Sequence, residues 1–297
     1  MLDNALILLP DFLIILFGCL LKRRFGYGGD FWLQLEKLVY YVLFPVMLFR
    51  SVVGSSLDLR EAGDMVLVGF AFTLTGVGLG MAGRWLSRDD SRSFASSVQC
   101  AFRFNTYIGL AVVDRVAGPA GVATFALLVG FIIPLANAAA VWFLARHSGG
   151  SLWRELLRNP LILATLGGLL CKGIGIELPA ALDRIGNLFS VTAITMGLLC
   201  VGAGLRLGAL RARLALVNYL TVVKLLVLPA VAIGCAALLE VGGTYRQAAV
   251  ILAALPTASS AYILATRMGG DGQLVASIIT LHVFAAMLTM PLWLSLA

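Results

Sequence analysis

Long apolar stretches follow one another along the whole chain, separated by short polar segments. A helix that crosses the hydrocarbon layer of a bilayer needs about 20 mostly apolar residues, because its backbone polar groups must be satisfied within the segment. Ten stretches meet this requirement, and the loops between them are too short to hold a soluble domain. The sequence therefore predicts an all-α integral membrane protein with ten transmembrane helices. The predicted spans are 4–21, 35–54, 65–83, 94–114, 119–144, 159–176, 180–204, 214–239, 245–266 and 274–296.

Composition agrees with a chain covered by lipid. Of the 297 residues, 60% are hydrophobic and only 12% are charged, against about 25% charged in a soluble domain. The net charge of +7 does not indicate a nucleic-acid partner, because the basic residues lie singly or in threes between apolar runs and form no solvated basic face.

The distribution of basic residues predicts how the chain lies in the membrane. Lys22, Arg23 and Arg24 follow the first apolar run instead of preceding it, so this run is predicted to be a span and not a signal peptide. Most of the 22 Lys and Arg residues fall on the side of that first loop. Cytoplasmic loops carry the excess of Lys and Arg. We therefore predict that both termini lie on the outer side of the membrane.

The two halves of the chain resemble each other. The segment Leu16–Lys22 matches Leu166–Lys172 at four of seven positions, and Pro10 matches Pro160 at the same offset of 150. Residues 182–185 then repeat the pattern of Leu35–Leu38, in which an acidic and a basic residue lie between two apolar residues. These matches predict two repeats of five helices, residues 1–148 and 149–297. Because five is odd, the second repeat must be inverted, an arrangement in which transporters bind substrate near the midplane between the repeats.

Polar residues gather in the fourth span of each predicted repeat. Polar groups inside a bilayer are costly, so those present usually have a function. In the ninth span Pro256 also removes a backbone donor, which opposes a straight helix. Individual hydroxyls can serve equally well to join helices. The candidate substrate-binding residues are Arg103, Asn105, Thr106, Tyr107, Asn137, Pro256, Thr257, Ser259 and Ser260.

Three ionisable residues in other spans are candidates for ion binding or charge pairing. Asp11 could pair with a base or bind a coupling ion, and Lys224 could be a counter-ion or could extend to the inner interface. His282 could carry a proton or be structural. No H-E-x-x-H or G-x-S-x-G motif, paired acids within a span, nucleotide-binding loop or Cys pair at metal-ligand spacing occurs, so we predict no catalytic residue, no cofactor and no metal site.

Several of these segments resemble the auxin efflux carrier family, in its bacterial branch. That family includes the plant PIN auxin exporters and bacterial carriers of malonate and other organic acids. The resemblance covers essentially the whole chain, and the motifs in the fourth and ninth spans are fairly specific together. The matching segments are Val42–Pro45, Arg103–Gly109, Leu255–Tyr262 and Gly269–Asp271.

The resemblance implies the ten-helix fold of bile-acid/sodium symporters and sodium/proton antiporters. In that fold the fourth and ninth helices unwind and cross, carboxylates bind at the crossing, and one group of helices moves in an elevator-like manner. Asn105 and Pro256 match the family's residues at the crossing. Plant members have a proline in the fourth helix where this chain has Phe104 and Asn105, so unwinding of that helix stays open. The resemblance also implies a homodimer.

Together these observations predict a secondary active or facilitative transporter of a small organic anion, with Na+ or H+ as the candidate coupling ion. A cation antiporter of the same fold is the alternative, disfavoured because Arg103 lies at the centre of the fourth span. An intramembrane enzyme is the third hypothesis, which no motif supports. The sequence does not identify the substrate or the direction of transport.

Overall fold

The computed structural model describes residues 2–54, 59–87, 91–144, 160–205 and 214–297, and every regular element in these ranges is helical. The predicted boundary between the two repeats, at residues 148 and 149, lies outside the described residues. The α-helices are α1 (Leu2–Arg24), α2 (Gly29–Leu38), α3 (Phe44–Val53), α4 (Leu59–Ala82), α5 (Ser91–Ser97), α6 (Thr106–Leu144), α8 (Pro160–Gly173), α9 (Ala180–Gly204), α10 (Leu214–Val222), α11 (Leu228–Leu238), α12 (Gly243–Ala254), α13 (Ser260–Arg267) and α14 (Gly272–Leu294). Short 3-10 or π-helical segments join some of them: η1 (Val39–Leu43), η2 (Gly83–Ser87), η3 (Val98–Ala101) and η4 (Val223–Val227).

Six helical segments in the described part of the chain are long and apolar enough to cross a membrane. One of them, Ser91–Leu144, has 54 residues, which as a straight helix would extend about 80 Å. This length far exceeds the roughly 30 Å of a bilayer's hydrocarbon core. Within it Gly118 has φ 59° and ψ −158°, a conformation that suits glycine alone, and there α6 turns back on itself. The helical segment is therefore divided at Gly118, which lies between the predicted spans 94–114 and 119–144.

Two of the spans contain a π-helical turn immediately before a proline. The turn η1 leads into α3, in which Pro45 is one of the first residues, and η4 leads into α11 with Pro229 in the same position. Proline lacks a backbone N–H and its ring crowds the carbonyl one turn earlier. A wider turn accommodates the ring without ending the helix. Residues 29–53 and 214–238 therefore each remain one continuous span.

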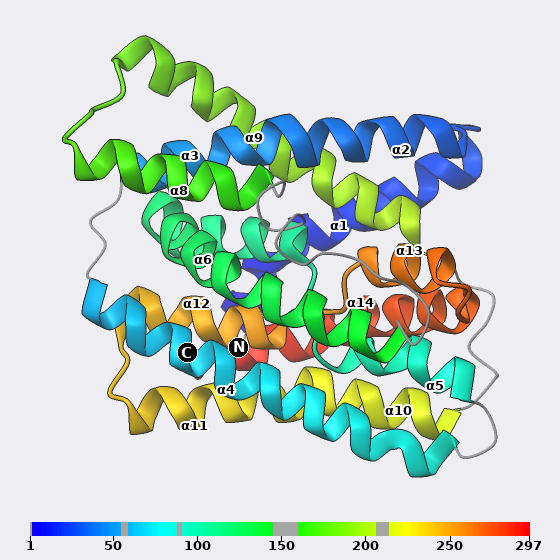
Figure 1. The fold of residues 1–297 in the computed structure, drawn as a ribbon. Coiled ribbons are helices and arrows are strands. Elements are labelled where there is room, and N and C mark those ends of the chain that lie inside the picture. The colour runs from blue at the N-terminus through cyan, green and yellow to red at the C-terminus, as the bar shows by residue number, and fades with distance from the viewer. Residues whose placement is uncertain (1, 55–58, 88–90, 145–159, 206–213) are drawn as a thin grey trace.

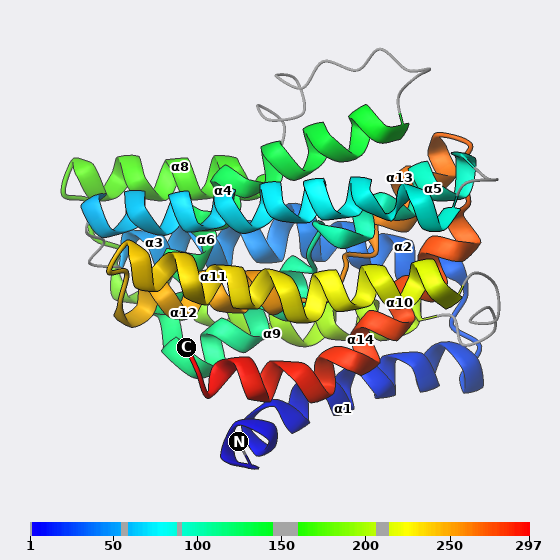
Figure 2. The same cartoon turned by 90° about the horizontal axis from the view of Figure 1, so that it is seen from below.

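The helices form two groups, which Figures 1 and 2 show from two directions. The first group consists of α1, α2–η1–α3, α8 and α9, in which α9 packs against α1 and α3 packs against α8. The second group consists of α4, α5–η3–α6, α10–η4–α11 and α12 to α14, centred on the contact between α12 and α6. Contacts of α6 with α3 and α9, and of α14 with α1, join the two groups. Both chain termini lie toward the same end of the helices (Figures 1 and 2).

Close packing of α1 against α9 depends on glycine. A Cβ atom built on Gly202 would overlap the Ile15 carbonyl of α1, and one built on Gly18 would overlap the Leu199 carbonyl of α9. Small residues let the backbones of membrane helices approach closely, which replaces the hydrophobic driving force that is absent in lipid. This contact makes α1 and α9 a rigid pair within the first group.

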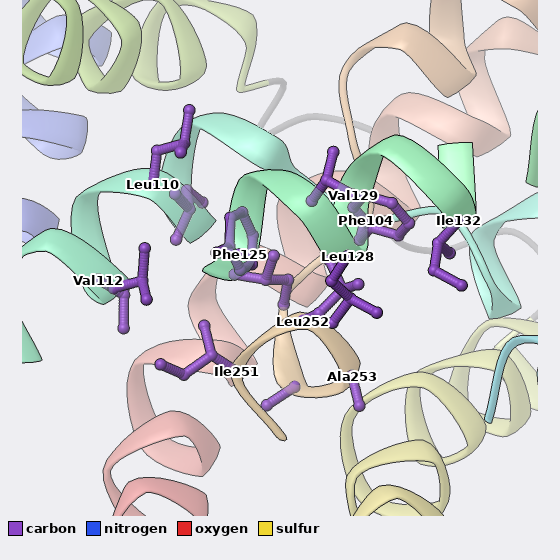
Figure 3. Close-up of a cluster of buried hydrophobic side chains, with 14 of the residues drawn as sticks. Phe104, Leu110, Val112, Phe125, Leu128, Val129, Ile132, Ile251, Leu252 and Ala253 are labelled. Carbon is purple, nitrogen blue, oxygen red and sulfur yellow. The ribbon is translucent and has the colours of Figure 1, made fainter. Parts of the chain in front are cut away.

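Apolar side chains fill the contact between α6 and α12 in the second group. Figure 3 shows Ile251 and Leu252 of α12 facing Phe125 and Leu128 of α6. Each of these four side chains is at most 1% exposed. Their packing fixes the end of α12 against α6, and so positions the non-helical segments that follow α12 and precede α6.

Candidate functional site

The two segments in which polar residues gather are breaks between helices. Helix α12 ends at Ala254 and α13 begins at Ser260, while η3 ends at Ala101 and α6 begins at Thr106. The first break follows from Pro256, because the residue before a proline avoids the helical region, and Leu255 is extended with ψ 144°. The fourth predicted span is thus broken as well, although it has no proline at this point.

The two breaks meet through their backbones. The Asn105 N–H donates a hydrogen bond to the Pro256 carbonyl with an N–O distance of 2.8 Å. Asn105 is only 3% exposed, and its side-chain Oδ1 accepts hydrogen bonds from the Tyr107 and Ile108 N–H groups at 3.1 and 3.3 Å. This is the geometry of a helix N-cap, in which an Asn side chain satisfies free N–H groups of the first turn. Asn105 therefore both starts α6 and joins it to the other break.

Arg103 links three elements around the breaks. Its Nη2 donates to Asn137 Oδ1 of α6 at 3.0 Å and to Ser260 Oγ of α13 at 3.2 Å, and its Nη1 donates to Gln99 Oε1 of η3 at 3.1 Å. The guanidinium is thereby held in one position beside the crossing. Asn137, a candidate substrate-binding residue, holds the arginine in this structure.

Behind the crossing, the Thr257 hydroxyl lies between two buried polar groups. It donates to the Cys100 carbonyl at 2.8 Å and lies 2.9 Å from His282 Nδ1 of α14. Because a hydroxyl has one hydrogen, its bond to Cys100 requires His282 to donate from Nδ1. The Nε2 atom is then an acceptor, and it has no hydrogen-bond partner among the described residues. His282 therefore supports the break from within the second group and is fully buried.

Lys224 also supports the broken helix from behind. It is fully buried, and its Nζ donates to the Ala253 carbonyl at 2.7 Å. The last four carbonyls of a helix lack partners within the helix and carry a partial negative charge. A lysine at the end of α12 satisfies one of them. The Lys224 side chain therefore lies inside the second group, against the end of α12.

A cavity of about 340 Å³ opens at the crossing, a volume within the range of small-molecule sites. Its wall comes from α2 and η1 of the first group and from the two breaks, α6 and α13 of the second group. The first turns of α6 and α13 both reach it, and helix starts carry free N–H groups and partial positive charge. The candidate residues that line it are Arg103, Asn105, Thr106, Tyr107, Asn137, Ser259 and Ser260.

The other candidates lie outside this cavity. Pro256 reaches it only through its carbonyl bond to Asn105, and Thr257 lies behind the crossing. Asp11 is 2% exposed and forms a two-pronged ion pair with Arg115 of α6, with distances of 2.7 and 3.0 Å. Of the two roles open for Asp11, pairing with a base is the one found.

Glu36 and Tyr40 of the cavity wall are absent from the sequence-based candidates. Glu36 lies just inside the predicted span 35–54, and its spacing from Tyr40 places both on one face of a helix. That spacing could have identified Glu36 and Tyr40 as neighbours. Which face of this helix points at the crossing depends on tertiary packing, which the sequence pattern does not report. A second cavity of about 240 Å³ adjoins this region and is lined by Glu36, Tyr107 and Ser259 together with Lys22 and Cys200. Among the described residues, no group of three or more His, Cys, Asp or Glu side chains could hold a metal ion.

Membrane-spanning helices, two breaks that meet inside the bundle and a polar cavity at their crossing define a polytopic membrane transporter. The model of the family described as membrane transport protein matches residues 144–294, about half of the chain. The chain belongs to this family, the auxin efflux carrier family, as the motifs in its sequence indicate.

Three similar proteins match along nearly their whole length. An uncharacterized transporter of Methanothermobacter thermautotrophicus is 26% identical over 287 residues, covering 94% of each chain. A putative malonate transporter of Rhizobium meliloti is 23% identical over 282 residues, covering 89% of this chain and 86% of its own. The uncharacterized transporter YfdV of Escherichia coli is 25% identical over 307 residues, covering 97% and 95%. The family and its members are transporters embedded in the membrane, so a small-molecule substrate follows for this chain.

Proposed function

We propose that this protein is a secondary active or facilitative carrier of a small organic anion, a carboxylate of the size of malonate. The observation that carries the proposal is the cavity at the crossing, where Arg103 and the first turns of α6 and α13 converge. Helix starts and an arginine fork both favour a carboxylate. The similarity to a putative malonate transporter agrees with this substrate class.

The balance of charge in the cavity favours an anion over a cation. Arg103 and Lys37 line it together with a single acidic residue of the described chain, Glu36. A sodium/proton-coupled cation antiporter of this fold would bind its cation through carboxylates in the membrane. That alternative is therefore the weaker one for this cavity.

The position of the cavity between the two groups of helices supports a mechanism of alternating access. One wall belongs to the first group and the other to the second, so sliding of one group past the other would expose the site to each side in turn. We propose that the second group moves in an elevator-type manner and carries the crossing with it. This mechanism requires no chemical reaction of the substrate, because the substrate is released unchanged.

The same proposal includes ten crossings in a five-plus-five inverted repeat, residues 1–148 and 149–297. Support comes from the corresponding positions of the two breaks, each in the fourth span of its half. Both termini lie toward one end of the helices, as an even number of crossings requires (Figure 1). The outer location of the termini, the bacterial inner membrane, a homodimer and Na+ or H+ coupling remain parts of this proposal.

Substitution of Asn105 tests the site without removing the helix start. Asp caps a helix as well as Asn does, so Asn105→Asp should keep the unfolding midpoint of the purified protein unchanged. It adds a negative charge to the cavity, and at an effective dielectric constant of 20 this should weaken malonate binding about 100-fold or more. Asn105→Ala should instead destabilise the fold by about 1 kcal/mol and weaken binding by about 10-fold.

Binding should be measured by isothermal titration calorimetry with malonate, and transport by counterflow of radiolabelled malonate in proteoliposomes. Wild-type protein should show both activities. Equal malonate affinity of the wild type and Asn105→Asp would remove the crossing as the anion site. Absence of both binding and counterflow in the wild type would contradict the proposed substrate class.

A further inference from the structure

Glu36 occupies the boundary between the two cavities. It lies on α2 of the first group and lines both of them, as do Tyr107 of α6 and Ser259 at the start of α13. Within the described part of the chain, neither cavity has another acidic side chain. A carboxylate from the first group therefore faces the crossing, which belongs to the second group.

The Glu36 carboxylate has no hydrogen bond and no ion pair with any residue that the structure describes, although the side chain is only partly exposed. Asp11 of α1, by comparison, is buried and is fully paired with Arg115. Leaving a carboxylate charged and without partners inside a membrane protein is costly. The structure therefore places a group that gains from binding a proton where the anion is proposed to bind.

The ionisable groups around Glu36 come from every element that faces the two cavities. Three carry positive charge: Lys22 of α1, Lys37 of α2 and Arg103 at the first break. Of these, Lys22 donates to the Ala203 carbonyl at 2.9 Å, and Arg103 is held by its own hydrogen bonds. The remainder are a thiol and phenols: Tyr40, Tyr41, Tyr107, Cys200 and Tyr262.

We propose that Glu36 is a proton-binding site whose protonation is coupled to binding of the substrate anion. The inference rests on the proposed function, because the coupled ligand is the anion at the crossing. A charged Glu36 and a bound carboxylate repel each other within one cavity, and a proton on Glu36 removes this repulsion. Since coupling between two sites is reciprocal, binding of the anion promotes binding of the proton by the same factor.

The chemistry of Glu36 suits a proton. A proton needs one carboxylate oxygen, and Glu36 is the one acidic side chain of the described residues that lines either cavity. Glu36 therefore supplies what proton coupling requires, namely one titrating group that shares its cavity with the substrate.

The test compares malonate binding by calorimetry from pH 4.5 to pH 8 in full-length wild type, Glu36→Gln and Glu177→Gln. Glu177 lies in the exposed segment between α8 and α9, away from both cavities, so Glu177→Gln is a matched control that also accounts for titration of malonate itself. In the wild type and the control, affinity should fall about 10-fold as Glu36 loses its proton. In Glu36→Gln it should change less than about 3-fold and resemble the wild type at low pH.

Proton uptake gives a second readout. Adding malonate to weakly buffered wild type should raise the pH reported by a soluble dye, and Glu36→Gln should show a much smaller rise than Glu177→Gln. Two results for Glu36→Gln would overturn the coupling: an unchanged pH dependence, or complete loss of malonate binding at every pH. Neither result would affect the proposed function, which is tested by malonate binding to the wild type. No malonate binding in the wild type would overturn both. If Glu36→Gln fails to fold, Glu36→Asp should shift the pH at which affinity changes, and an unshifted midpoint would overturn the inference.

Discussion

Thr257 satisfies two buried polar groups from different helices with one hydroxyl. Replacing it with valine, which has the same shape, leaves the Cys100 carbonyl and His282 Nδ1 without this partner. Each orphaned group costs about 1–3 kcal/mol. We expect Thr257→Val to lower the free energy of unfolding by about 2–4 kcal/mol, measured by denaturant unfolding in detergent.

Thr73 offers a matched control for this substitution. It is equally buried on α4, but its hydroxyl has no hydrogen-bond partner among the described residues. Removing an unsatisfied hydroxyl is neutral or stabilising, so Thr73→Val should not lower stability. Equal destabilisation by the two substitutions would show that the hydrogen bonds of Thr257 contribute nothing beyond the packing of its side chain.

At the scale of the helix, the contact of α1 with α9 should tolerate no added atom at Gly202. The Cβ atom of Gly202→Ala would overlap the Ile15 backbone, which cannot move as a flexible side chain can. We expect the melting temperature in detergent to fall by several degrees, consistent with a loss of about 2 kcal/mol or more. Gly234→Ala on α11 is the control, because a Cβ there meets no atom within 4 Å. That substitution should be neutral or slightly stabilising, since alanine favours a helix.

The sequence predicts some elements closely and others poorly, for physical reasons. Residues 180–204 coincide with α9 because this segment is predominantly apolar and Pro179 precedes it. By contrast, the predicted span 35–54 begins six residues after the start of α2 at Gly29. The first turns of α2 contain Asp30 and Gln34, which lower its hydropathy. They remain helical because α2 packs on α9 and continues into η1, a tertiary effect that periodicity does not report.

The break before α6 shows the same limit. The sequence has no proline there, so only the resemblance to a family suggested that the helix is interrupted. The interruption is produced by the Asn105 side chain, which caps α6, and by the partner backbone at Pro256. The candidate site was predictable from the clustering of polar residues, whereas Glu36 and the roles of Asn137 and Lys224 depend on contacts between distant segments.

At the scale of the whole molecule, the ion pair of Asp11 with Arg115 joins the two groups of helices. The Asp11 side chain is 3% exposed and that of Arg115 is 39% exposed, so the partners are not equivalent. Arg115→Gln leaves a buried carboxylate without its partner and should destabilise the fold by about 3 kcal/mol. Asp11→Asn should cost less, because the arginine can reach water or lipid headgroups.

The double variant Asp11→Asn/Arg115→Gln should recover most of the stability lost in Arg115→Gln, as measured by thermal unfolding. Additive losses would mean that the two residues act independently. If the groups move past each other during transport, the ion pair must open in each cycle, so the double variant should also change the rate of malonate counterflow.

The hydrogen bond between the two breaks uses only main-chain atoms, the amide of Asn105 and the carbonyl of Pro256. The Asn105 side chain caps α6 and Pro256 ends α12, but neither side chain takes part in the bond itself, which at position 105 only proline would remove because it has no N–H to donate. Substrate selectivity can therefore change through substitution of the residues around this hydrogen bond, while the hydrogen bond itself is kept. Such a fold suits related carriers that transport different substrates.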